Sequence, residues 1–117
     1  MQTALRLSPR DPQAPQWQSF LCYLRTHLAQ WNQAIEECEK AVAASPQNDG
    51  PFGDLVAAYA WAGRDKEAQE TARQLQRLDR NHIQFMRTYS DVHDNPTFKA
   101  EVARIIEGLR RAGMPEE

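Results

Sequence analysis

Apolar residues recur at intervals of three or four along most of this 117-residue chain, which is the spacing of one face of an α-helix. Asp49 and Asp65 are good helix-start residues, and Asn95-Pro96 separates the last two apolar segments. Segments with the strict alternation of a strand are lacking. The pattern therefore predicts an all-α protein, with helices over 2–7, 14–29, 31–44, 49–62, 65–79, 82–92 and 96–112.

The predicted helices form pairs that repeat at an interval of 34 residues. A period of this length is typical of stacked helix-turn-helix units. The second copy is the clearer one, with a large apolar residue at Phe52, a tight turn at Gly63 and a small residue at Ala68. Four positions of the first copy return one period later: Leu21, Ala34, Glu36 and Ala41 correspond to Leu55, Ala68, Glu70 and Leu75.

The last predicted helix keeps the same register. Gly108 lies inside it, at a cost of about 0.5–1 kcal/mol, which suggests that a neighbour packs closely there. We expect a degenerate third repeat whose second helix caps the array. Its apolar residues lie one period after Ala68, Ala72 and Leu75, at Val102, Ile106 and Leu109.

The second copy resembles the tetratricopeptide repeat family in Phe52, Leu55, Tyr59, Gly63, Arg64, Ala68 and Leu75. The resemblance implies a right-handed superhelix of antiparallel helix pairs, with about two full repeats and a degenerate third. The implied repeats span 14–46, 48–80 and 81–113, and residues 1–13 resemble the end of a preceding repeat. Half a repeat cannot bury its apolar face alone, so we expect a piece of a longer protein. The alternative is a small natural protein whose first helix is its own cap.

The segments 5–12 and 107–116 look like the C-terminal repeat region of bacterial adenylate or guanylate cyclases and related signalling regulators. This resemblance implies a non-catalytic module that binds a protein or peptide and regulates an effector domain of the same signalling protein. Two alternatives remain open. One is self-association into a homodimer through Trp17, Phe20 and Leu24, and the other is a free-standing adaptor.

In the tetratricopeptide family, the first helices of successive repeats line a concave groove that holds the partner. Tyr23 and Trp61 are the groove residues that we expect to matter most, because aromatic side chains supply much of the energy of interfaces. The alternative for both is packing against a neighbouring helix. The family frame assigns eight residues to the groove: Ser19, Tyr23, His27, Asp54, Ala57, Trp61, Gln84 and Arg87.

Charge and motifs exclude several other functions. The net charge of -2 favours neither nucleic acid nor an anionic membrane as a partner. The longest apolar run, 55–62, is too short to span a bilayer, so we expect a cytoplasmic protein. The histidines are scattered, no cluster has metal-ligand spacing, and no nucleophile elbow occurs. We therefore expect no enzyme, no cofactor and no metal.

The chain has two cysteines, Cys22 and Cys38. In the repeat frame both fall where small residues pack between helices, so they are expected to act as small buried hydrophobic residues. A disulfide would seldom persist in a reducing cytoplasm. We therefore expect free thiols.

Overall fold

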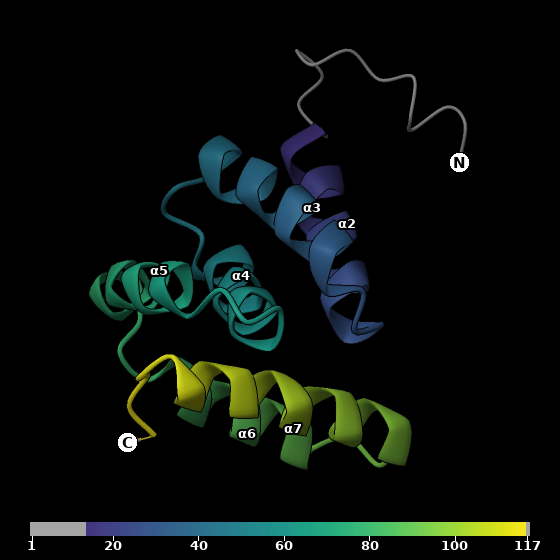
Figure 1. Ribbon diagram of the computed structural model, residues 1–117. Coiled ribbons are helices and arrows are strands. Elements are labelled where there is room, and N and C mark those ends of the chain that lie inside the picture. Colours follow the sequence, from purple (N-terminus) through teal and green to yellow (C-terminus); the bar gives the residue numbers. More distant parts are fainter. Residues whose placement is uncertain (1–13, 117) are drawn as a thin grey trace.

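The computed structural model describes residues 14–116, which form six α-helices and no strand (Figure 1). This confirms the predicted all-α architecture, with helix bounds within two residues of those expected. The predicted helix over 2–7 lies outside the described residues. The helices are α2 (Ala14–His27), α3 (Trp31–Ala44), α4 (Asp49–Trp61), α5 (Asp65–Leu78), α6 (His82–Asp91) and α7 (Pro96–Arg111).

Local sequence signals explain several of these bounds. The Asn48 side chain accepts a hydrogen bond from the Gly50 amide at the start of α4. At the start of α7, the Asn95 side chain accepts from two amides, and Pro96 occupies the first turn, where its missing N–H costs nothing. Gly63 ends the α4 region with a φ of 80°, a left-handed conformation that glycine adopts readily.

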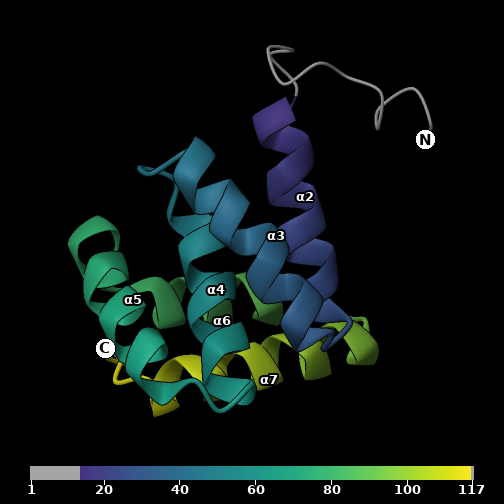
Figure 2. The ribbon, with the colours of Figure 1, turned by 45° about the horizontal axis from the view of Figure 1, so that its top comes forward.

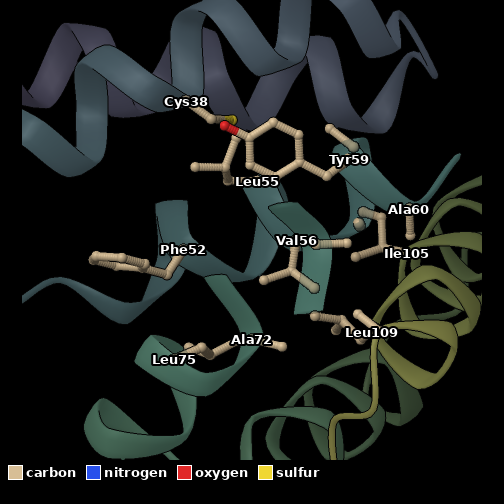
Figure 3. Packing of buried hydrophobic residues seen from close by; sticks show 14 of the residues in the cluster. Cys38, Phe52, Leu55, Val56, Tyr59, Ala60, Ala72, Leu75, Ile105 and Leu109 are labelled. Atoms are coloured by element: carbon tan, nitrogen blue, oxygen red, sulfur yellow. The ribbon is translucent and has the colours of Figure 1, made fainter. Parts of the chain in front are cut away.

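The first two helix pairs stack as successive repeats. α2 pairs with α3, α4 pairs with α5, and α4 also packs against α2 and α3. α4 is therefore surrounded by other helices, and nearly every residue from Pro51 to Ala60 is buried. This explains why the longest apolar run of the chain lies in α4. Figure 3 shows the core around it, including Phe52, Val56 and Leu75.

The third pair turns back across the other two. α7 crosses α4 at a large angle and packs against it, and the first half of α7 also lies near the end of α2 (Figure 2). Trp61 on α4 donates its indole N–H to the backbone carbonyl of Arg104 at 2.8 Å. The Arg104 guanidinium in turn donates to the carbonyl of His27 at 3.1 Å. The capping helix thus covers part of the face of α4 that was expected to line the groove.

The apolar face of α7 accounts for this position. Val102, Ile105 and Leu109 are buried, and Figure 3 shows Ile105 and Leu109 directed toward Val56 and Ala60 of α4. Val102 and Ile106 are larger than Ala68 and Ala72, the residues at the matching places in α5. At Gly108 the two helix backbones come close instead, as the sequence had suggested for this position.

No helix within residues 14–116 is both long enough and apolar enough to cross a membrane.

Candidate functional site

A cavity of about 230 Å³ opens where α2, α4, α6 and α7 meet. Its walls are largely apolar, and each of the four helices contributes side chains to them. Because α7 covers the other end of α4, this cavity is the part of the expected groove that stays open on these helices. It is lined by Tyr23, His27, Gly50, Asp54, His82, Phe85, Met86, Tyr89, Phe98 and Val102.

Six aromatic rings form a continuous series around the cavity. Consecutive ring centroids lie 4.2 to 6.4 Å apart, in the range of favourable aromatic pairing. Phe85 and Tyr89, on successive turns of α6, are 59% and 50% exposed. Aromatic side chains this exposed are costly to leave in water. In order, the series is Tyr23, His27, Phe98, Tyr89, Phe85 and His82.

Asp54 supplies a carboxyl group to this apolar site. It lies on α4, between buried residues on either side, and burial raises its pKa from 3.8 to about 7. Its Oδ2 atom lies 3.8 Å from Sγ of Cys22. Burial also raises the pKa of Tyr23, and the negative charges of Asp54 and Glu101 add to that effect. The site is therefore one in which a negative charge is poorly solvated.

His27 anchors α7 to the end of α2. Its side chain is almost fully buried, and Nδ1 lies 2.8 Å from Oε1 of Glu101. The imidazole stacks on Phe98, and its ring centroid lies 4.2 Å from that of Tyr23. The Arg104 bond to the His27 carbonyl strengthens the same junction. His27 thus belongs both to the cavity wall and to the contact that positions α7.

His82 has the matching role at the start of α6. Its Nδ1 atom lies 3.3 Å from Oδ2 of Asp49 and 3.6 Å from Oδ2 of Asp79. The opposite edge of the ring fills the space beside Gly53, where a side chain would collide with it. These three side chains form a group whose atoms could ligate a cation. Their contacts with one another already explain their positions, as bonds that hold α6 against α4.

The residues expected in the groove fall into three sets. Tyr23, His27 and Asp54 line the cavity together. Ala57 and Trp61 lie under α7, where Ala57 is fully buried and Trp61 stacks on Trp31. The remaining three do not line the cavity: Ser19 is half-buried on α2, and Gln84 and Arg87 are exposed on α6.

Sequence reasoning missed most of the aromatic series. Phe85, Tyr89 and Phe98 were not assigned to the groove, although they supply half of its rings. One signal was present: apolar residues between His82 and Asp94 fit a buried helical face only partly. That imperfect fit now has a reason, since Phe85 and Tyr89 face an open cavity and not the core.

The two cysteines correct an expectation. Cys22 and Cys38 are joined by a disulfide that links α2 to α3, with 4.6 Å between the Cα atoms, so they are not free thiols. Both are fully buried, as the repeat frame predicted. The small side chains at these helix crossings bring the two backbones close enough for the bond to form. A bonded Cys22 has no thiol proton to donate to Asp54.

Stacked antiparallel helix pairs around an open inner face define a helical-repeat protein. The family model of the tetratricopeptide repeat matches residues 28–86, from the turn after α2 into α6, and the chain belongs to this family. Members of the family are in general non-catalytic modules for protein–protein interaction. None of the curated proteins matches the chain.

Proposed function

We propose that this chain is a protein-interaction module that binds a short peptide segment of its partner at the aromatic cavity. The observation that carries the proposal is the placement of Phe85, Tyr89 and Tyr23, each at least 42% exposed, around one apolar hollow. Aromatic side chains clustered at a concave, pre-formed site are typical hot spots of recognition.

Because α7 covers part of α4, the length of the partner segment that can bind is limited. α7 lies over Ala57 and Trp61, so a partner helix running the whole length of the inner face would have to displace it. Displacement would break the Trp61–Arg104 and His27–Glu101 contacts and expose Ile105 and Leu109. A short segment that inserts one or two side chains between α2 and α6 requires none of this.

The test is a selection of random peptides against the immobilised protein. Selected peptides are expected to lose at least tenfold in affinity when Tyr89→Ala or Phe85→Ala is introduced, about 1.4 kcal/mol or more. Leu28→Ala is the matched control, because Leu28 is a similarly exposed apolar residue outside the cavity. Circular dichroism verifies that each variant is folded. Peptides that bind all three variants as tightly as the parent would rule out the cavity as the binding site.

The wider role that we propose is regulation of an effector domain in a bacterial signalling protein, acting in the cytoplasm. The end segments that resemble cyclase-associated repeats support it. The sequence of the gene on either side of this segment tests it, since an adjoining cyclase or DNA-binding domain is expected. Thiol trapping in cells tests the location, because a persistent Cys22–Cys38 disulfide would count against a reducing compartment.

Self-association is the second candidate. Phe20 on α2 is 47% exposed and its ring lies 5.7 Å from that of Trp17, so an apolar patch marks the first helix of the described residues. Sedimentation of the chain at high micromolar concentration tests this. A dimer that Phe20→Ala converts to a monomer would support it, and a parent chain that sediments as a monomer would remove it.

A further inference from the structure

Carboxylates surround the cavity, and Arg104, which donates to the backbone carbonyl of His27, does not itself line it. Asp54 lines the wall, and Glu101, Asp49 and Asp79 contact the two cavity histidines from behind. None of the ten lining residues is a lysine or an arginine. A ligand group that enters this space therefore meets aromatic faces and the Asp54 carboxyl group, and no lysine or arginine of the cavity wall.

We propose that the cavity recognises an organic ammonium group, the side chain of a lysine or of an N-methylated lysine presented by the peptide partner. This inference rests on the function proposed above and names its specificity. The negative faces of aromatic rings attract a cation within about 6 Å, most strongly where water is excluded. An alkylammonium stem also matches the apolar walls, since lysine buries its methylene groups readily.

Asp54 makes the charge preference strong. Its carboxylate lies in apolar surroundings, and among the described contacts its nearest partner is Sγ of a disulfide-bonded cysteine. Above about pH 7, where this carboxyl group ionises, its charge is expensive in such a place because it has no charge partner there. An ammonium group in the cavity would supply that partner. A neutral aliphatic side chain would not compensate the charge of the ionised Asp54 carboxylate, and an anionic group would be repelled by it.

The experiment titrates the protein with small probes and follows the ring resonances of Tyr23, Phe85 and Tyr89 by NMR. The probes are choline, which is a quaternary ammonium, n-butylammonium, and 3,3-dimethylbutan-1-ol, the neutral isostere of choline. Saturable shifts are expected, with at least one of the two cations binding tenfold or more tightly than the alcohol. The stronger of the two cations tells whether the methylated or the unmodified ammonium is preferred.

Two variants separate charge from shape. Asp54→Asn is expected to reduce the cation preference to threefold or less while the alcohol binds as before. Phe85→Ala is expected to weaken all probes. Asp94→Asn is the matched control, because it removes the same charge from an exposed position between α6 and α7 that does not line the cavity. It should leave the preference unchanged.

The outcomes distinguish this inference from the proposed function. If neither choline nor n-butylammonium bound more tightly than the neutral alcohol, the ammonium specificity would be overturned, even if selected peptides still depend on Phe85 and Tyr89. The specificity would also be overturned if peptides selected from a library that includes N-methylated lysine were enriched in neither form of lysine. Conversely, cation binding that depends on Asp54, with no peptide selected at all, would support the ammonium site and overturn the peptide as the molecule that presents it.

Discussion

Gly108 of α7 lies directly against the backbone of Ala57 in α4. A Cβ atom at position 108 would come 3.0 Å from Cα of Ala57 and 3.1 Å from the indole ring of Trp61. Contacts this close with backbone cannot be relieved by rotating a side chain. The crossing of α4 and α7 therefore depends on the absence of a side chain at Gly108.

Gly108→Ala is expected to destabilise the protein although alanine favours helices. The helix gains up to about 1 kcal/mol from the change, but the clash with α4 costs more, and we expect a net loss of about 1–3 kcal/mol. Urea denaturation measures the free energy of unfolding. Gly50→Ala is the control, since a Cβ there would meet only the Asn48 side chain at 3.6 Å. Equal stability of Gly108→Ala and the parent would contradict the close crossing.

Trp61→Phe is expected to weaken the attachment of α7. The change removes the indole N–H that donates to the Arg104 carbonyl and leaves that partly buried acceptor without this donor, at a cost of about 1–2 kcal/mol. The affinity for a cavity-binding peptide should stay within twofold, because Trp61 does not line the cavity. A large loss of affinity at unchanged stability would instead make Trp61 a binding residue, as the family frame alone suggests.

The helices and the repeat could be read from the sequence because their signals are local. Asn48, Asn95 and Gly63 mark helix ends through contacts within a few residues. The register of small residues at Ala34 and Ala68 fixes which faces are buried, and both are buried here. Such features need no knowledge of where distant helices lie.

The candidate site could be read only in part, because it depends on where α7 packs. Tyr23 and Asp54 belong to the first two repeats, and both residues, which the family frame assigns to the groove, line the cavity. The frame left Phe98 out and assigned Ala57 to an open groove that α7 covers. The packing of α6 and α7 onto the first two repeats depends on contacts between residues far apart in the sequence. The main sequence signal for it is Gly108.

The turns between the two helices of each full repeat offer a paired test. Ala29 has a φ of 58° in the turn between α2 and α3, and Gly63 has a φ of 80° one period later. A left-handed conformation costs a residue with a Cβ about 1–2 kcal/mol. We expect Ala29→Gly to raise the melting temperature slightly and Gly63→Ala to lower it. Thermal unfolding measures both, and a lower melting temperature for Ala29→Gly would contradict the strained turn.

Reduction of the disulfide is expected to lower stability by roughly 2–4 kcal/mol, because the Cys22–Cys38 bond closes a loop of 16 residues and restricts the unfolded chain. Urea denaturation with and without a reductant measures the difference. The double variant Cys22→Ala/Cys38→Ala is the control and should not respond to the reductant. An unreduced parent protein that carries two titratable thiols would contradict the bond itself.

Asp54→Asn is expected to change how stability depends on pH. Burial raises the pKa of this carboxyl group from its ordinary 3.8 to about 7, so between these pH values the folded state holds a proton that the unfolded state has released. The free energy of unfolding therefore has its full value, as far as this group is concerned, below about pH 4, and it falls as the pH rises to about 7.

The asparagine variant does not titrate at position 54. Its free energy of unfolding should match that of the parent near pH 4 and exceed it by roughly 1–3 kcal/mol at pH 8. Tyr23, His27, His82 and Glu101 also face this region, but they are present in both proteins, so the difference between the two curves isolates Asp54. Denaturation at a series of pH values measures it. A difference that stays constant from pH 4 to pH 8 would show that Asp54 is ionised in the folded protein throughout, and that the cavity solvates its charge.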